Sequence, residues 1–125
     1  MVLGMGTDLI EVQRIRESID RFGQRFLSRI FTPVEQSYCQ RKANSSERFA
    51  ARFAAKEAGM KAIGTGWNLG VTFLDFEVVN LPSGRPTLNL SGRAKHVAAE
   101  LGVRTISLSL THTALQGLAV VILED

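Results

Sequence analysis

Two carboxylates and one lysine are the side chains of this sequence with the clearest chemical potential. Asp8 follows an apolar stretch, where a carboxylate is unusual unless it caps a helix, forms an ion pair or binds a cation. Glu57 and Lys61 are four residues apart in a segment of helical periodicity, so their side chains lie on one face. Two simpler interpretations stay open from spacing alone. Asp8 could cap a helix that begins near residue 10, and Glu57 could form an ordinary surface ion pair with Lys61.

Lys56, next to Glu57, is harder to explain as a surface residue. It falls within the apolar arc that Phe49, Phe53, Met60 and Ile63 form at helical spacing. An ammonium group in such an arc must either extend to the surface along its own aliphatic chain or meet an anion. The sequence favours neither solution.

A histidine and several glycines are weaker candidates for function. His112 lies between the last two expected strands, where a turn residue bonded to backbone is the simplest role. Residues 82–86 predict a hairpin turn, in which Gly84 would let a flat group approach the backbone closely. The glycine pairs in residues 4–6 and 64–66 are too short for a phosphate-binding loop or a dinucleotide motif.

The hydrophobic pattern predicts the elements that position these residues. Capping signals place one helix start at Thr32–Glu35 and another at Asn44 with Glu47. Gly64 and Gly66 should end the second of these helices. The expected elements are a strand over 1–8, helices over about 10–22 and 26–30, a helix from 33, the longest helix over 45–63, strands over 71–80 and 87–90, a helix over 91–101, and strands over 104–111 and 117–123.

The order β-α-α-α-α-β-β-α-β-β predicts an α+β fold, with helices packed against a mainly antiparallel sheet. A chain of 125 residues with 45% hydrophobic content suits one domain, residues 1–125. Its 15 Lys and Arg residues exceed its 12 Asp and Glu residues by only three, which does not indicate a polyanion-wrapping protein.

The sequence also limits the expected compartment. The single cysteine, Cys39, excludes an intrachain disulfide, and no Cys/His cluster has zinc-site spacing. The N-terminal residues carry no cationic segment typical of a signal peptide. No apolar window approaches the roughly 20 residues of a bilayer-spanning helix. We therefore expect a soluble, cytoplasmic protein without a membrane partner.

Four blocks together resemble the holo-acyl-carrier-protein synthase family of 4′-phosphopantetheinyl transferases along nearly the whole chain. They are Gly4–Glu11, Arg52–Glu57 with Lys61, Gly84–Pro86 and Ser109–Thr113. The resemblance implies a small α+β homotrimer that transfers the phosphopantetheine arm of coenzyme A to a serine of an acyl carrier protein in fatty acid biosynthesis. Residues 67–70, Trp-Asn-Leu-Gly, stand where the family varies.

The resemblance also implies roles for individual residues. Asp8 and Glu57 would bind Mg²⁺, which takes few carboxylates and keeps positions for substrate phosphates. Lys61 would contact the diphosphate and offset charge on the leaving phosphate, which makes Asp8, Glu57 and Lys61 the expected catalytic set. A metal-associated water, Asp8, Glu11 and Glu35 all remain open as the base. Coenzyme A, bound between neighbouring subunits, would contact Arg52, Lys56, Lys61, Gly64, Ser83, Gly84, Arg85, Pro86, His112 and Thr113.

The first expected helix offers a surface for the acidic carrier protein. Arg14 and Arg21 are seven residues apart and share a face, and Arg25 would extend it only if the helix continued through Gly23. A solvated helix face explains most such charge patterns. A mixed basic and apolar patch nevertheless suits an acidic helical partner. The expected carrier contacts are Arg14, Arg21, Phe22, Arg25 and Phe26.

Two rival functions are weaker. A small basic module that binds RNA or DNA has support only from the positive charge, since the chain lacks an aromatic stacking run or a nucleic-acid motif. A structural trimer without catalysis would be expected to have lost Asp8, Glu57 or Lys61, and all three are present.

Overall fold

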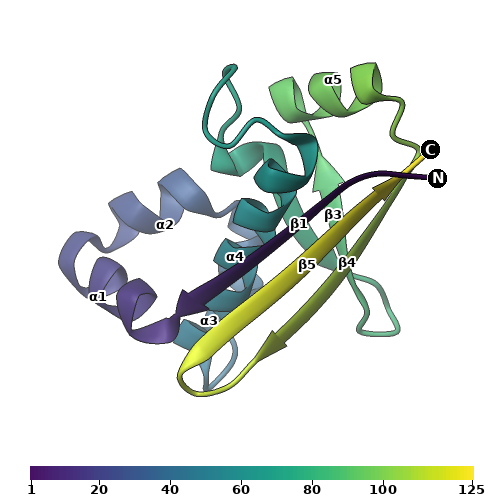
Figure 1. Cartoon of the computed structure of the whole chain (residues 1–125). Helices are drawn as coiled ribbons and strands as arrows, with labels where there is room; N and C mark the ends of the chain where they lie inside the picture. The colour runs from purple at the N-terminus through teal and green to yellow at the C-terminus, as the bar shows by residue number, and fades with distance from the viewer.

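A computed structural model describes all residues, 1–125, and confirms the α+β class and the order of the strands and α-helices (Figure 1). The first half holds one strand and four helices, and the second half holds two hairpins around one helix. The elements are β1 (Val2–Glu11), α1 (Val12–Phe22), α2 (Gln24–Ile30), α3 (Pro33–Gln40), α4 (Ser45–Ile63), the 3₁₀ turn η1 (Phe73–Asp75), β2 (Phe76–Asn80), β3 (Pro86–Leu90), α5 (Gly92–Leu101), β4 (Thr105–His112) and β5 (Gln116–Glu124).

The strands form two antiparallel sheets, where the sequence had suggested one. The larger sheet has the order β1-β5-β4, and Ala119 of β5 lies between Asp8 of β1 and Leu110 of β4. The smaller sheet is the β2-β3 hairpin. The two chain ends lie side by side, and the N-terminal ammonium group is 2.7 Å from Oδ1 of Asp125.

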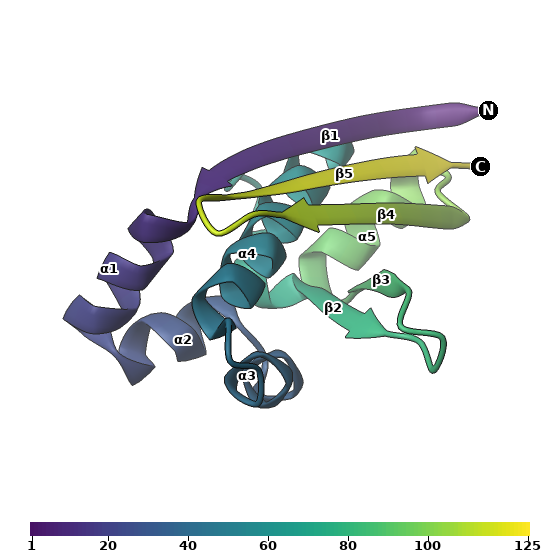
Figure 2. The same cartoon turned by 90° about the horizontal axis from the view of Figure 1, so that it is seen from below.

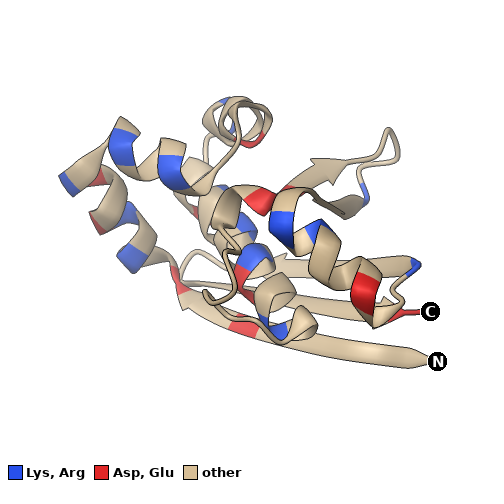
Figure 3. Ribbon diagram, turned by 90° about the horizontal axis from the view of Figure 1, so that it is seen from above, with Lys and Arg blue, Asp and Glu red and all other residues tan.

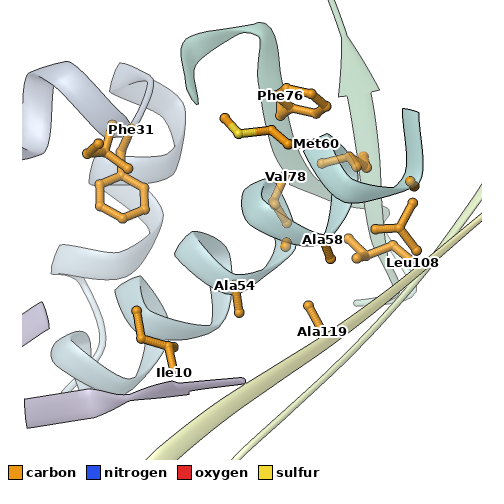
Figure 4. Packing of buried hydrophobic residues seen from close by; sticks show 14 of the residues in the cluster. Ile10, Phe31, Ala54, Ala58, Met60, Phe76, Val78, Leu108 and Ala119 are labelled. Carbon is orange, nitrogen blue, oxygen red and sulfur yellow. The ribbon is translucent and has the colours of Figure 1, made fainter. Parts of the chain in front are cut away.

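Helix α4 is the centre of the fold. It lies against the inner face of the larger sheet, with the other helices and the smaller sheet around it (Figure 2). Ala54 and Ala58 point from α4 towards Ala119 of β5, and these small side chains let helix and sheet approach closely (Figure 4). The helix ends as the sequence predicts, because Gly64 follows it in the left-handed conformation with φ 78°. None of the helices combines the length and apolar character needed to cross a lipid bilayer.

The predicted bounds of two strands were wrong. The first strand continues to Glu11, so α1 begins at Val12 and Asp8 lies inside a strand instead of capping a helix. The expected strand over 71–80 begins only at Phe76. Residues 73–75 form η1 instead, where the carboxylate of Asp75 accepts hydrogen bonds from the backbone N–H groups of Thr72 and Ala94. These bonds hold Asp75 as a cap at two helix starts.

Candidate functional site

The site begins with the close contact of β1 and α4. A Cβ atom on Gly4 would lie 2.3 Å from the carbonyl oxygen of Ala62, and one on Gly6 would lie 1.9 Å from that of Ala58. Only glycine permits this approach of strand to helix backbone. Alternate residues of β1 face α4, so Asp8 is the next residue after Gly6 to face the helix. The contact therefore brings Asp8 to α4 near Glu57.

Lys61 joins this pair through Asp8. Its Nζ lies 3.1 Å from Oδ1 of Asp8 and donates to the carbonyl oxygen of Thr7 at 3.0 Å. The side chains of Lys61 and Asp8 are 52% and 16% exposed, so a ligand can reach the ammonium group from solvent. Glu57 and Lys61 form no ion pair within 4.0 Å, so the interpretation as an isolated helix surface pair was wrong.

Glu57 has the electrostatic surroundings of a cation ligand. Partial burial raises the pKa of the Glu57 carboxyl above its usual value, and the negative charge of Asp8 raises it further. Three nearby groups act in the opposite direction and lower this pKa, namely Lys61, the indole of Trp67 and Arg14. Two carboxylates that repel each other favour a hard divalent cation between them. Mg²⁺ commonly takes one or two protein carboxylates, so this donor set fits it.

Lys56 is fully buried, which corrects its assignment to coenzyme binding. Its ammonium group lies 2.7 Å from Oε1 of Glu35 and donates to the carbonyl oxygens of Phe73 and Phe76. Both side chains of the ion pair are 0% exposed. Burial lowers the pKa of Lys56, and the carboxylate of Glu35 opposes that effect. All three ammonium protons have partners, so Lys56 fastens α4 to its neighbours and has none free for a ligand.

Glu35 is correspondingly excluded as the base. Its other carboxylate oxygen, Oε2, accepts from the backbone N–H of Val78 at 2.8 Å, and Oε1 also accepts from that of Thr32 at 2.9 Å. The Thr32 bond completes the capping box that the sequence predicted at the start of α3. A buried carboxylate with these fixed partners has no route to a substrate hydroxyl.

Arg52 connects α4 to the expected coenzyme loop. Only 4% of the residue is exposed, and its guanidinium lies 4.1 Å from the centre of the Tyr38 ring. One terminal nitrogen donates to Oδ1 of Asn80 at 2.6 Å, and the Asn80 amide donates in turn to the carbonyl oxygen of Gly84 at 2.9 Å. The buried Nε of Arg52 has no partner. Arg52 thus keeps a buried, unpaired N–H group, while its terminal nitrogen connects to the loop of residues 81–85 through Asn80.

The remaining expected coenzyme residues lie in separate places. Nδ1 of His112, at the end of β4, lies 3.1 Å from a carboxylate oxygen of Glu47, and Thr113 follows it. Gly64 lies at the C-terminal end of α4. Ser83, Gly84, Arg85 and Pro86 lie at the tip of the β2-β3 hairpin and the start of β3.

These residues fall into two groups around α4. Arg52 and Lys56 point towards α3 and β2, whereas Glu57 and Lys61 are rotated by about 100° or more around the helix axis towards β1. Within one chain the metal-type pair and the hairpin loop therefore lie on different sides of the helix.

Positive charge gathers on the two helices that follow β1 (Figure 3). Gly23, with φ 56°, ends α1, so the basic face does not continue as one helix and Arg25 belongs to α2. The corner between α1 and α2 still forms a groove lined by Phe22, Arg25, Phe26 and Arg29. Phe22 is 49% exposed, and the guanidinium of Arg21 lies 5.2 Å from its ring centre.

Three features of the site escaped the sequence interpretation. The glycines at positions 4 and 6 are too few for a nucleotide-binding motif, but their alternation along a strand is the signal for close packing of that strand on a helix. Arg29 follows Arg25 by four residues, a spacing visible in the sequence. Trp67 lies in a loop with its ring centre 5.9 Å from that of Phe73, and no periodic pattern predicts such a contact.

An α+β scaffold that brings two carboxylates and an ammonium group together is typical of enzymes that transfer phosphate-containing groups with a divalent cation. The family model of the 4′-phosphopantetheinyl transferase superfamily matches residues 4–119. A holo-[acyl-carrier-protein] synthase of Solibacter usitatus is 61% identical over 125 residues, which cover 100% of both chains. The chain belongs to this superfamily, and within it to the holo-[acyl-carrier-protein] synthases.

Solved structures agree with this assignment. The crystal structure of the holo-[acyl-carrier-protein] synthase of Neisseria meningitidis matches with a TM-score of 0.91 and 34% identity, over 100% of both chains. The Helicobacter pylori synthase, solved in complex with coenzyme A, matches with a TM-score of 0.85 and 32% identity over 96% of this chain and 99% of that one. The family resemblance in the sequence is therefore confirmed, and the protein is an enzyme.

Proposed function

We propose that this enzyme transfers the 4′-phosphopantetheine group from coenzyme A to a serine of an apo-acyl carrier protein, with Mg²⁺ bound by Asp8 and Glu57. Adenosine 3′,5′-bisphosphate is released, and the product serves fatty acid biosynthesis. The observation that carries the proposal is the meeting of Asp8, Glu57 and the exposed Lys61 where β1 crosses α4.

The residues divide the work at the diphosphate. A bound Mg²⁺ would supply positive charge to the phosphate oxygens and so make the phosphorus atom a better electrophile. Lys61 is free to leave Asp8 for a phosphate oxygen, because its side chain is half exposed and its carbonyl partner on Thr7 is neutral. An ammonium group there offsets the charge that develops on the leaving 3′,5′-bisphosphate.

The base that accepts the serine proton comes from a short set of candidates. Glu35 is excluded by its burial against Lys56. Glu11 is exposed at the end of β1, where its Oε1 accepts from the side-chain amide of Gln116 at 2.9 Å. Asp8, Glu11 and a metal-associated water remain, and each lies on or beside β1.

We further propose a homotrimer with coenzyme A between neighbouring subunits. The metal pair with Lys61 and the hairpin loop with Arg52 lie on different sides of α4, so residues from two chains would complete one site. The outer face of the larger sheet supports assembly, because Met5, Leu9 and Leu118 are 62%, 60% and 37% exposed there. Large apolar side chains exposed on one face of a sheet are typical of an interface.

The carrier protein would dock on the groove between α1 and α2. The charge of Arg14 is among those that lower the pKa of Glu57, and α1 packs on α4, so the basic helix extends towards the metal pair. Arginine and phenylalanine side chains that alternate along the groove suit an acidic helix with exposed apolar residues.

We propose residues 1–125 as one domain that acts in the cytoplasm.

Intact-mass spectrometry of the carrier protein tests the proposal. Purified enzyme, apo-carrier protein, coenzyme A and Mg²⁺ should yield a carrier heavier by one phosphopantetheine group. A carrier whose modified serine is replaced by alanine is the matched control and should keep its mass. An authentic apo-carrier that gains no mass would refute the transferase function.

A further inference from the structure

Asn80, the last residue of β2, connects two of the expected coenzyme residues through its side-chain amide. Its Oδ1 accepts a hydrogen bond from a terminal nitrogen of Arg52 at 2.6 Å, and its Nδ2 donates to the carbonyl oxygen of Gly84 at 2.9 Å. Arg52 lies on α4, 28 residues earlier in the chain, and Gly84 lies in the loop between β2 and β3. One amide therefore ties this loop to the central helix of the fold.

The two partners fix the orientation of the amide. A guanidinium group only donates hydrogen bonds, and a carbonyl oxygen only accepts them. The amide oxygen of Asn80 must therefore face Arg52, and its NH₂ group must face Gly84. An aspartate at this position would keep the first bond and lose the second, and an alanine would lose both.

Arg52 is a firm anchor for this chain of hydrogen bonds. The residue is 4% exposed, and its guanidinium lies 4.1 Å from the ring centre of Tyr38. A planar guanidinium that is buried and stacked on an aromatic ring has little freedom to move. Asn80 transmits that fixed position outward to the carbonyl group of Gly84.

The loop of residues 81–85 is exposed along its whole length. Two backbone hydrogen bonds of 2.8 Å close the turn, one from Leu81 to the carbonyl oxygen of Arg85 and one from Gly84 to that of Leu81. Gly84 has φ 91°, and no atom lies within 4 Å of the place that a Cβ would take, so its backbone is open to a flat group. These backbone bonds shape the turn itself, whereas the bond from Asn80 places the turn relative to α4.

The placement of the loop also shapes a cleft beside it. Arg85 and Pro86 line a cavity of about 440 Å³ together with Ser107 and Ser109 of β4. A cation, two hydroxyl groups and apolar surface around one cavity suit a ligand that is both flat and anionic. A shift of the hairpin tip would change the width of this cleft.

We propose that Asn80 is a positioning residue that holds the 81–85 loop in the conformation that binds the nucleotide end of coenzyme A. The inference rests on the proposed role of Gly84, Arg85 and Pro86 in binding this coenzyme. With the Asn80 bonds in place, the loop is ordered before the ligand arrives. Without them, ordering the loop consumes part of the binding free energy.

Binding of adenosine 3′,5′-bisphosphate, the nucleotide part of the coenzyme, measures this role without turnover. In isothermal titration calorimetry its Kd should rise about tenfold in Asn80→Ala, the effect of losing one hydrogen bond of ordinary strength. Thr87→Val is the matched control, because it removes a 2.8 Å hydrogen bond to the carbonyl oxygen of Val79 in the same hairpin but none in the loop. The control should bind the nucleotide like the wild type.

Steady-state kinetics separate positioning from a general loss of structure. Asn80→Ala should raise the KM for coenzyme A about tenfold and keep kcat and the KM for the carrier protein within twofold of the wild type, because the loop contributes binding that the ground state and the transition state share.

Asn80→Asp isolates the bond to the loop. It keeps the partner of Arg52, so the test stands even if Asn80→Ala is poorly stable, and it replaces the donor to Gly84 by an acceptor. Its Kd for adenosine 3′,5′-bisphosphate should also rise about tenfold, measured in about 0.5 M salt to screen the added negative charge. Wild-type affinity in Asn80→Asp would show that the pairing with Arg52 suffices and would overturn the proposal.

The other outcomes separate this inference from the proposed function. Unchanged nucleotide affinity in Asn80→Ala, or an equal loss in Thr87→Val, would overturn the role of Asn80 while leaving the coenzyme site in place. A lower kcat with an unchanged KM for coenzyme A would also overturn it and would assign Asn80 to the chemical step. A wild-type enzyme that does not bind adenosine 3′,5′-bisphosphate would instead refute the proposed coenzyme site.

Discussion

Gly6→Ala tests whether the close contact of β1 and α4 builds the site. The added Cβ would lie 1.9 Å from the carbonyl oxygen of Ala58 and 2.8 Å from the backbone nitrogen of Ala62. Ordinary contacts begin near 3.4 Å, so the strand and the helix must separate by about 1.5 Å, the difference between 3.4 and 1.9 Å. Both obstructing atoms belong to the backbone and cannot rotate away. Asp8, two residues further along β1, must then move away from Glu57.

The size of both effects follows from this displacement. Overpacking of this kind costs about 1–3 kcal/mol, or more where backbone must shift. A melting temperature lower by about 4–12 °C is therefore expected. A misplacement of about 1 Å at a reacting centre reduces the rate about 100-fold, and we expect a loss of at least that size in the rate of carrier modification.

Two assays and one control decide this prediction. Circular dichroism gives the melting temperature, and intact-mass spectrometry gives the initial rate of carrier modification. Gly102→Ala is the control, because no atom lies within 4 Å of its added Cβ and it is remote in sequence from the candidate site. With φ 86° it should lose about 1 kcal/mol of stability but keep its rate. A Gly6→Ala enzyme with wild-type rate and melting temperature would refute the proposed role of this contact.

Three further predictions address the interior and the carrier surface. Lys56→Met leaves Glu35 as an unpaired buried charge and should lower the free energy of unfolding by about 3–5 kcal/mol in urea titrations. The double variant Lys56→Met with Glu35→Leu should lower it less. Equal losses in the two variants would contradict the ion-pair account. Arg21→Glu should raise the KM for the carrier protein about tenfold with kcat within twofold and a weaker salt dependence, while Arg16→Glu, on another face of α1, should change KM less than twofold. Burial raises the pKa of the Cys39 thiol to about 12, so iodoacetamide should not label the native enzyme at a pH of about 8.5 but should label it in urea; native labelling at the unfolded rate would contradict this.

The sequence predicted the order of elements well because local signals mark their ends. The capping box of Thr32 and Glu35 and the left-handed Gly64 both lie where they were expected. The site residues that depend on contacts between distant segments were harder. Lys56 has the same sequence pattern whether it meets a ligand or an internal carboxylate, and only the fold shows that Glu35, 21 residues earlier, faces it.

The pairing of Asp8 with Lys61 shows the same limit. Helical periodicity places Glu57 and Lys61 together, because it describes contacts within one helix only. In the fold β1 approaches α4, and Lys61 pairs with the carboxylate of Asp8 on that strand. The family resemblance predicted a shared role for Asp8 and Glu57 but not the ion pair of Asp8 with Lys61. The glycines of β1 give the physical reason why Asp8 reaches α4 at all.

The Mg²⁺ dependence of carrier modification tests the central claim most directly. The initial rate of mass gain should be abolished when EDTA removes divalent cations from the wild-type enzyme, and should return when Mg²⁺ is added in excess. Glu57→Gln, which keeps the size of the side chain but removes its charge, should lose at least about 100-fold in rate and require more Mg²⁺ for half-maximal activity. A wild-type rate in EDTA, or a Glu57→Gln enzyme with the Mg²⁺ response of the wild type, would contradict the assignment of Asp8 and Glu57 as the cation site.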